Sequence, residues 1–364
     1  MRAASSVWAI PIVIVLVGCA GSPAATPAPV SAALATLPPV SAASTTPPPT
    51  SPTVTPALPS SPGVPSPSPI AKPTPIATIW PAAETLPTSG RIAFTIERGE
   101  TESHGAYIDS AGFHLLPTGG DNTFGNATWA PGDTIIFDSE RAGQRHIFRM
   151  GIDGQNVMQL TSGDTAQDSA TVSPDGTLIA FGDVSPAENR DIGIHLANID
   201  GSNVRDLTPG SGPGVVGEDN AAFSPDGQWV AFGRASDPTT QQNGLFLIRT
   251  DGTGVRRLTP DALGADEPHW SLDGKRILFI RGTSDVGIVD VASGKWTLLT
   301  DPNDPGLSTD ASWSPDGTQI VFRHFTPDVA LSIQLLVMNA DGTHQATLWV
   351  APTGYGANRP AWGS

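Results

Sequence analysis

From residue 89 onward, short runs of alternating apolar and polar residues are separated by turn-forming sequences. In the stretch 221–259, the runs Ala221–Phe223, Gln228–Phe232, Gly244–Arg249 and Val255–Thr259 are divided by a Ser-Pro-Asp-Gly turn, a polar loop and an Asp-Gly turn. A period of two residues is typical of β-strands, and Pro and Gly at these positions favour tight hairpin turns. The pattern predicts a four-stranded antiparallel meander, and helical periodicity is absent beyond residue 90.

The same module recurs along the last three quarters of the chain. Each copy starts with an aromatic or apolar residue that is followed by Ser-Pro-Asp-Gly or a close variant, and its last strand ends in Leu-Thr or a similar pair. The copies begin at Trp129, Val172, Phe223, Trp270 and Trp313, and Trp362 starts a sixth copy that is cut short. Repeats of about 40–50 residues with four short strands each are typical of β-propeller blades.

The two ends of the array complement each other. Residues 359–362 match the first strand of a blade, whereas residues 89–94 match a second strand that has no first strand before it. With Ala106–Asp109 and Phe113–Thr118 they complete one blade. We therefore predict an all-β fold, a six-bladed β-propeller over residues 89–364 that is closed by pairing of the N- and C-terminal strands. Closure removes the free sheet edges that would otherwise promote aggregation.

Residues 1–19 have the features of a lipoprotein signal peptide. Arg2 supplies a positive charge, Val7–Val17 is apolar, and the sequence Leu-Val-Gly-Cys ending at Cys19 is similar to a bacterial lipobox. The apolar run is too short for a good membrane-spanning helix. We expect Cys19, the only cysteine, to become the acylated N-terminus and to anchor the protein on a bilayer. The alternative is an ordinary secretory signal with an incidental cysteine.

Residues 20–88 consist almost wholly of Ala, Pro, Ser, Thr and Val, with Lys72 and Glu84 as the only charges. Such a segment buries too little apolar surface to offset its conformational entropy. We expect a disordered tether of polyproline II character that acts as a passive spacer and that offers Ser and Thr residues for O-glycosylation.

The charge of the propeller restricts its partners. Without Arg2, Lys72 and Glu84, the totals of 19 basic and 35 acidic residues leave 17 and 34 for the propeller, a formal net charge of −17. Nucleic acid and anionic membrane surfaces are disfavoured, because neither would be attracted to this surface. A basic protein surface, a cation or a neutral glycan remains allowed.

The repeats Trp-Ser-Pro-Asp-Gly, Ile-Ala-Phe, Asp-Gly and Leu-Thr resemble the WD40-like (PD40) repeats of the TolB family of six-bladed propellers. TolB-like proteins belong to the periplasmic Tol–Pal system, so the resemblance implies an exported location and a propeller that binds other proteins. Two features depart from the family. Residues 20–88 could not build the α/β domain that precedes the TolB propeller, and a lipid anchor is foreign to the soluble periplasmic TolB.

The connections predict where a partner would bind. One rim of a meander carries the Pro-Asp-Gly and Asp-Gly turns, which barely vary, and the other carries connections of variable length, where function usually resides. Near this second rim, six residues stand just before the first strands and are expected at the mouth of the central channel: Asn126, Asp168, Asp219, Asp266, Asp310 and Asn358. By resemblance to TolB-like propellers, a partner segment would dock there. The alternative is that these side chains only cap the turn into each inner strand.

The chain lacks the residue patterns of most catalytic classes. The chain has no Gly-x-Ser-x-Gly elbow and no His-Glu-x-x-His motif, and its single cysteine is assigned to the lipid. His195, His269 and His324 would form a metal site only if the channel brought them together, and scattered histidines are the simpler interpretation. We therefore expect no catalytic residue, no metal and no cofactor. A carboxylate pair for glycoside hydrolysis stays open, since its members would come from distant blades.

Together these features predict a membrane-anchored, extracytoplasmic interaction module that faces the periplasm or the cell exterior as a monomer. Its propeller rim would bind a protein or a cell-envelope component, and nucleic acid is not expected as a partner. The alternative function is a carbohydrate-active enzyme or a glycan-binding propeller that uses channel carboxylates.

Overall fold

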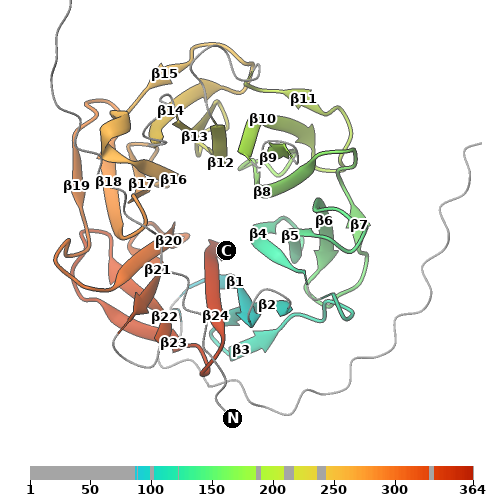
Figure 1. Cartoon of the computed structure of the whole chain (residues 1–364), viewed down its shortest axis with the longest axis horizontal. Coiled ribbons are helices and arrows are strands. Elements are labelled where there is room, and N and C mark those ends of the chain that lie inside the picture. The colour runs from blue at the N-terminus through green and yellow to red at the C-terminus, as the bar shows by residue number, and fades with distance from the viewer. Residues whose placement is uncertain are drawn as a thin grey trace, which may run out of the picture. The chain divides into compact units, whose positions relative to one another are not determined.

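The computed structural model describes residues 87, 89–98, 102–121, 123–185, 190–208, 217–235, 243–327 and 332–363. These residues form six four-stranded antiparallel sheets that are arranged around a central axis (Figure 1). The predicted signal peptide and nearly all of the predicted tether lie outside the described residues. The predicted all-β, six-bladed architecture is confirmed.

We number the sheets as blades, each written from the innermost strand outward. Blade 1 contains β4 (Gly125–Ala130), β5 (Thr134–Ser139), β6 (His146–Gly151) and β7 (Met158–Gln159). Blade 2 contains β8 (Ala166–Val172), β9 (Leu178–Ser185), β10 (Arg190–Asn198) and β11 (Arg205–Asp206). Blade 3 contains β12 (Gly217–Phe223), β13 (Trp229–Ala235), β14 (Asn243–Arg249) and β15 (Arg256–Arg257).

Blade 4 contains β16 (Ala265–Trp270), β17 (Arg276–Arg281), β18 (Asp285–Asp290) and β19 (Trp296–Leu298), and a short 3-10 turn, η1 (Asp261–Leu263), precedes it. Blade 5 contains β20 (Leu307–Trp313), β21 (Gln319–Thr326), β22 (Ser332–Asn339) and β23 (Ala346–Val350). Blade 6 contains β24 (Gly356–Gly363), β1 (Arg91–Arg98), β2 (Glu102–Asp109) and β3 (Gly112–Leu115).

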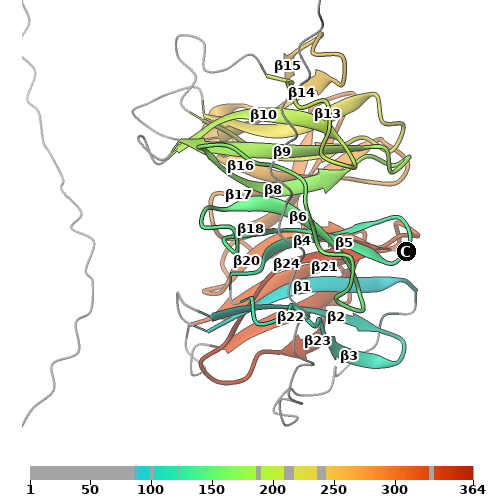
Figure 2. The ribbon, with the colours of Figure 1, turned by 90° about the vertical axis from the view of Figure 1, so that its right-hand side faces the viewer.

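Blade 6 closes the ring, because its innermost strand comes from the C-terminus and its other three come from the beginning of the propeller. β24 pairs antiparallel with β1 from Arg91↔Gly363 to Glu97↔Gly356, and the two strands lie side by side in Figures 1 and 2. Trp362 secures the joint: its indole Nε1 donates to the carbonyl of Ser89 at 2.9 Å. The predicted pairing of the two chain ends is confirmed.

The hydrophobic core consists of six clusters, and each cluster joins two neighbouring blades. Between blades 2 and 3, for example, Ile194 and Leu196 pack with Phe223 and Phe232. Equivalent clusters fill the other five interfaces, including both interfaces of blade 6. Each sheet is therefore buried on both faces, which explains the continuous apolar runs in the second strands.

The tryptophans that start the repeats link consecutive blades. Trp129, Trp270 and Trp313 each donate the indole N–H to the carbonyl of a residue in the innermost strand of the preceding blade, whereas the Trp362 indole bonds to Ser89 within its own blade. The pairs are Trp129 with Ala361 at 3.1 Å, Trp270 with Ala222 at 3.1 Å and Trp313 with His269 at 3.2 Å. A large apolar ring with one polar atom suits an interface where a single carbonyl needs a donor.

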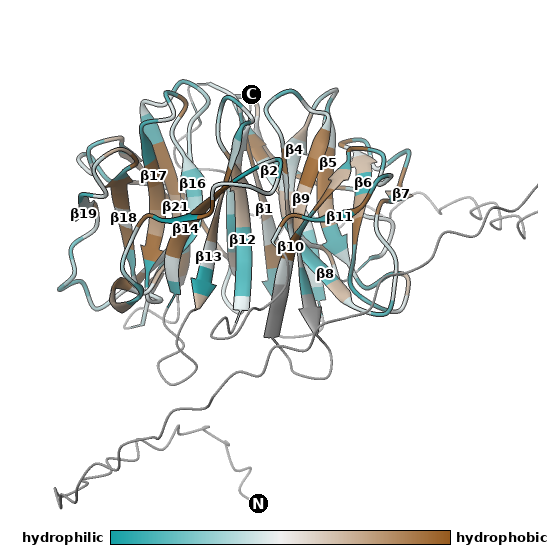
Figure 3. Ribbon diagram, turned by 90° about the horizontal axis from the view of Figure 1, so that it is seen from above, coloured by the Kyte–Doolittle hydropathy of each residue, from teal (hydrophilic) through white to brown (hydrophobic). Residues whose placement is uncertain are grey.

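The Ser-Pro-Asp-Gly motif forms the hairpin between the first two strands of a blade. In blade 3 the Ser224 hydroxyl donates to Asp226 Oδ1 at 2.5 Å and accepts the Trp229 N–H at 2.9 Å. Gly227 takes a φ of +68°, which a residue with a Cβ rarely adopts. These turns and the Asp-Gly turns make a largely hydrophilic rim, which is the edge that carries the C-terminus in Figure 3.

The Leu-Thr motif continues the pairing of the outermost strand. β7, β11 and β15 are only two residues long. Just beyond them, a threonine hydroxyl accepts the N–H of the third strand, as Thr259 does from Leu245 at 2.8 Å. Thr161, Thr208 and Thr300 make the same contact in blades 1, 2 and 4. The side chain thus satisfies a buried donor that the short strand does not reach.

Trp362→Ala is expected to lower the free energy of unfolding by about 3–5 kcal/mol, because it removes a buried indole and its hydrogen bond from the joint that closes the ring. Urea unfolding followed by circular dichroism measures this change. Trp296→Ala is the control, since the Trp296 side chain lies in an outermost strand and is 44 % exposed. Equal losses in the two variants would contradict a special role for the joint.

Candidate functional site

Each innermost strand contains the same irregularity. In all six blades, three residues of the innermost strand span two residues of its neighbour, as Asp219↔Gly233 and Ala222↔Ala231 do in blade 3. This arrangement is a β-bulge, in which one extra residue leaves the hydrogen-bond ladder and bends the strand. The first residue of every bulge has a positive φ, between 42° and 54°.

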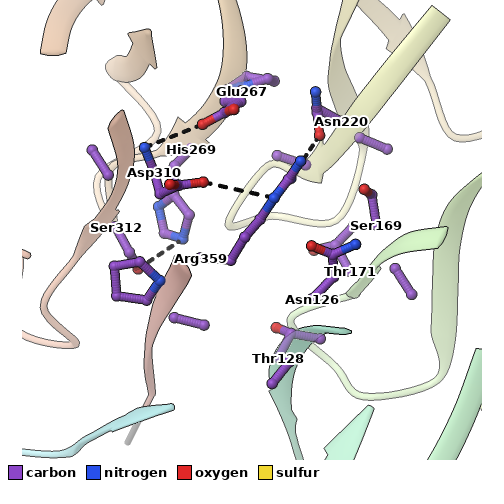
Figure 4. A pocket seen from close by; sticks show the side chains of 18 residues that line it. Asn126, Thr128, Ser169, Thr171, Asn220, Glu267, His269, Asp310, Ser312 and Arg359 are labelled. Carbon is purple, nitrogen blue, oxygen red and sulfur yellow. Dashed lines mark hydrogen bonds and ion pairs between the residues drawn. The ribbon is translucent and has the colours of Figure 1, made fainter. Parts of the chain in front are cut away.

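We call these six residues the bulge ring: Asn126, Ser169, Asn220, Glu267, Asp310 and Arg359. None is glycine, although left-handed backbone is unfavourable for side chains other than Asn and Asp. Together with the two residues that follow each of them, they line a central cavity of ≈ 150 Å³ (Figure 4). Strained backbone concentrates at functional sites, so six copies around one channel point to the channel as the candidate site.

Arg359 lies across the channel. It belongs to β24 in blade 6, yet its guanidinium donates to Asn220 Oδ1 of blade 3 at 2.8 Å. On the way its Nε passes 3.6 Å from Asp310 Oδ1 of blade 5, as Figure 4 shows. Burial lowers the pKa of Arg359, but the carboxylates of Glu267 and Asp310 outweigh it and raise that pKa above its usual range. Arg359 therefore stays charged and narrows the passage.

Glu267 and Asp310 place two carboxyl groups beside Arg359. The Asp310 backbone N–H donates to Glu267 Oε2 at 3.2 Å. Burial, with a smaller contribution from the Asp310 carboxylate, raises the pKa of Glu267 to about 7. Behind the pair, burial lowers the pKa of His269 to about 4, and its Nε2 lies 3.3 Å from the Ser312 hydroxyl. At neutral pH the His269 imidazole is therefore neutral, and the Glu267 carboxyl is partly protonated.

A second layer lies one residue closer to the channel mouth, at the rim of the variable connections. In blades 2 and 3 an aspartate on the innermost strand faces a glycine on the next strand, Asp168↔Gly182 and Asp219↔Gly233. A Cβ at Gly233 would clash with the carboxylates of Asp219 and Asp266. The glycine therefore provides the space that these carboxylates occupy.

Blade 1 has the same pair with its members exchanged. Here Gly125 is on the innermost strand and Asp138 is on the next strand. A Cβ at Gly125 would lie 2.6 Å from Asp138 Oδ2. Burial, followed by the carboxylate of Asp168, raises the pKa of Asp138 to about 7. Blades 1 to 4 thus each place one carboxylate in the mouth layer: Asp138, Asp168, Asp219 and Asp266.

The other side of the mouth differs. The corresponding pairs are Thr309↔Arg323 in blade 5 and Asn358↔Thr95 in blade 6. Arg323 lies 4.0 Å from Asp310 Oδ2, and Arg359 adds a second guanidinium. Blades 1 to 4 therefore each place a carboxylate at the mouth, blade 5 places Arg323 there, and the guanidinium of Arg359 reaches from blade 6 to Asn220 of blade 3.

The structure places the six predicted rim residues at the channel but in two different layers. Asn126 and Asp310 are members of the bulge ring, whereas Asp168, Asp219, Asp266 and Asn358 precede it by one residue and belong to the mouth layer. All six lie within the innermost strands, which start earlier than predicted, and not in the loop before them. The predicted set therefore has one residue in each blade but combines two positions, because the sequence alone does not show the extra residue of each bulge.

Sequence reasoning missed Ser169, Asn220, Glu267, Arg359 and the mouth residue Asp138. A simple signal could have found the first four. Every member of the bulge ring stands three residues before the residue that starts the repeat, as Glu267 stands before Trp270. Asp138 has no such signal, because it comes from a second strand and only the pairing register brings it to the mouth.

The three histidines that were considered for a metal site do not converge. His269 lines the channel, His195 lies between Asp183 at 3.3 Å and Asp206 at 3.1 Å in blade 2, and His324 contacts Ser308 at 3.0 Å in blade 5. Despite the opposing effect of burial, Asp183 raises the pKa of His195. Within the described ranges, no group of three His, Cys, Asp or Glu side chains could hold a metal ion.

Aspartates in the turns of the opposite rim have a structural role. Asp175, Asp226, Asp273 and Asp316 each accept a serine hydroxyl and a backbone N–H within their turn. These hydrogen bonds lower the pKa of the four carboxyls. The turn aspartates therefore accept hydrogen bonds within their own turns, whereas the mouth aspartates lie at the channel.

Comparison with known proteins agrees with this architecture. Residues 184–364 match the family described as the TolB beta propeller domain. The domain is a propeller of the TolB type. Over 170 residues, 45 % of this chain, it is 27 % identical to the TolB homolog of Chlorobium luteolum, and over 132 residues, 35 % of this chain, it is 33 % identical to that of Chlorobaculum tepidum. The matches cover 36 % and 27 % of those proteins.

An uncharacterized protein of Agrobacterium fabrum is 28 % identical over 167 residues, which are 43 % of this chain and 54 % of that protein. The TolB-type chain thus spans about half or less of the length of these curated relatives.

Solved structures show the same fold. TolB from Acinetobacter baumannii superimposes with a TM-score of 0.62 at 23 % identity, over 75 % of this chain and 66 % of that one. A putative TolB from Agrobacterium tumefaciens gives a TM-score of 0.57 at 20 % identity, over 76 % of this chain and 99 % of that one. In the part of the TolB-type chain that the structure describes, no helix has the length and hydrophobicity to cross a membrane.

Glu267→Gln is expected to change how stability depends on pH. A carboxyl with a higher pKa in the folded than in the unfolded chain takes up a proton on folding. Its contribution to the free energy of unfolding therefore decreases as the pH rises from about 4.5 to about 7. The amide does not titrate. Relative to wild type, the variant should gain on the order of 2 kcal/mol between pH 4.5 and pH 8, measured by urea unfolding.

Glu140→Gln serves as the control, because the Glu140 side chain is 49 % exposed, and it should leave the pH profile unchanged. Parallel profiles for wild type and Glu267→Gln would show that Glu267 does not take up a proton on folding.

Proposed function

We propose that the protein is a lipid-anchored, extracytoplasmic interaction module. In this proposal the acidic side of the channel mouth binds a basic segment of a partner protein or of a cell-envelope component. The lipid on Cys19 holds the chain at the membrane, residues 20–88 act as the tether, and residues 89–364 act as a monomeric propeller.

The distribution of charge around the mouth carries this proposal. Four consecutive blades each contribute one carboxylate: Asp138, Asp168, Asp219 and Asp266. A basic segment would be attracted to this group of carboxylates, where Arg145 is the cation with which it would compete at Asp138 and Asp168. The formal net charge of −17 over the predicted propeller favours the encounter at longer range.

The contacts of the mouth aspartates also support a role beyond capping. Asp266 accepts the Glu267 N–H at 2.7 Å and the Asn243 amide at 2.6 Å, so it has a structural duty as well. Asp168 differs, since Arg145 lies 3.8 Å from its Oδ2 and its side chain is 21 % exposed. A carboxylate held this loosely is available to an incoming cation.

A carbohydrate-active function is the second candidate, and the Glu267–Asp310 pair favours it. A carboxyl with a pKa near 7 beside a second carboxyl in a channel is the pattern of a general acid and its charged companion. Arg359 crosses the same space and restricts it to ≈ 150 Å³, which makes binding at the mouth the stronger proposal. Turnover of a polysaccharide panel that Glu267→Gln abolishes would reverse this order.

The mouth is tested by the triple variant Asp168→Asn, Asp219→Asn and Asp266→Asn. We expect about tenfold weaker capture of an exported partner by the full-length chain, measured by crosslinking in membranes followed by co-purification. The matched control, Asp200→Asn, Asp251→Asn and Asp341→Asn, removes the same charge from the turns of the opposite rim. If the two triples capture the same amount, the mouth is not the binding surface.

The anchor is tested by Cys19→Ser. This variant should leave the membrane fraction and lose incorporation of labelled fatty acid, because no remaining segment supplies an acyl chain. Ala20→Ser, which keeps the cysteine, should behave as wild type. Membrane retention of Cys19→Ser without label in the wild-type protein would remove the lipid anchor from the proposal.

A further inference from the structure

A second pocket of ≈ 340 Å³ adjoins the channel between blades 6 and 1, and it shares Asn126 and Arg359 with the central cavity and Asp138 with the mouth layer. Its walls come from β1, β2, β4, β5 and β24. We call it the blade 6–1 pocket. Its charged lining consists of Glu97, Glu102, Asp138, Glu140, Arg145 and Arg359, so four carboxyl groups face two guanidinium groups.

Two buried oxygen atoms of this pocket have no hydrogen-bond partner among the described residues. They are Oδ1 of Asp138 and Oγ1 of Thr95. Asp138 is 2 % exposed and Thr95 is 1 % exposed. Buried polar atoms are nearly always paired, because an unpaired one costs the free energy of its lost hydration. Two such acceptors in the lining of one pocket indicate a binding site for a hydrogen-bond donor.

Asn126, Arg145 and Arg359 favour the charged form of the Asp138 carboxyl, against the effect of burial on its pKa, but Oδ1 still has no hydrogen-bond partner among the described residues. Arg145 approaches only its other oxygen, Oδ2, at 3.7 Å, and divides its guanidinium between Asp138, Asp168 at 3.8 Å and Glu140 at 3.3 Å. Gly125 faces the carboxylate, and Asp138 Oδ2 itself fills the space beside this glycine. The blade 6–1 pocket therefore lacks a compact positive charge next to Oδ1.

From this geometry we infer that the blade 6–1 pocket binds a primary ammonium group, with Asp138 Oδ1 and Thr95 Oγ1 accepting its N–H donors. An ammonium carries three donors around a point charge, which suits two separate acceptors. A guanidinium binds most favourably to both oxygens of one carboxylate, and Arg145 already approaches Oδ2. The inference does not rest on the proposed partner binding, since a free amine would occupy the pocket equally.

The test measures binding of n-butylamine and of 1,4-diaminobutane to the full-length protein at pH 8 by isothermal titration calorimetry. Two further probes with the same butyl chain separate the contribution of the charge from that of the N–H donors. Butan-1-ol has no charge, and butyltrimethylammonium has the charge but no N–H donor. Both should bind at least about tenfold more weakly than butylamine.

Asp138→Asn should reduce amine affinity at least about tenfold and raise the melting temperature of the free protein, because it removes a buried charge that Arg145 at 3.7 Å compensates only weakly. Thr95→Val should weaken binding several-fold and also stabilise the free protein, and it keeps the test decisive if Asp138→Asn fails to fold. Asp133→Asn is the matched control. It changes the same charge in blade 1, and Asp133 pairs with Arg91 outside the pocket, with a side chain that is 67 % exposed.

N-acetyl-lysine methylamide separates two sources of the ammonium. Tighter binding of this compound than of the diamine assigns the pocket to a lysine side chain of a protein, and the reverse order assigns it to a small free amine. Absence of saturable amine binding, or equal affinity in wild type, Asp138→Asn and Thr95→Val, would overturn the inference. Retained amine binding in the Asp168, Asp219 and Asp266 triple variant would separate this pocket from the proposed partner surface.

Discussion

Hydrogen bonding between β24 and β1 is the constraint on which the rest of the structure depends. Each blade buries both faces of its sheet against its neighbours, so a blade without a neighbour would expose a complete apolar face. Only a closed ring gives every blade two neighbours. The chain achieves closure by placing its last strand innermost in the blade that its first strands began. The indole of Trp362 and the carbonyl of Ser89 fix that position.

Closure also determines what the channel contains. Arg359 is the bulge residue of β24, and it reaches Asn220 and Asp310 only when this strand is in place. The same strand carries Asn358 at the mouth. The electrostatics of the channel are therefore not a property of individual blades. They arise when the last strand docks and brings a permanent positive charge into a space lined by acidic and amide side chains.

The sequence predicted the fold well because the signals for it are local. Ser224, Asp226 and Gly227 make one turn from adjacent residues, and the same residues recur at a regular period. The bulges were not predicted, because an extra residue is defined only by the strand opposite it. Asp138 reached the mouth through pairing with Gly125, and the raised pKa of Glu267 depends on burial that the whole ring creates. The position of Asp138 and the pKa of Glu267 depend on contacts between strands and blades, and the residue spacing within one repeat does not reveal such contacts.

The bulge ring has a consequence for how such proteins diversify. Six separate strands contribute one side chain each, and the positions already accommodate Asn, Ser, Glu, Asp and Arg at nearly the same backbone angles. The extra residue stands outside the hydrogen-bond ladder, so its replacement leaves the pairing of the sheet untouched. A single substitution at this position in any one repeat can thus change a side chain that lines the channel without changing the pairing of the sheet.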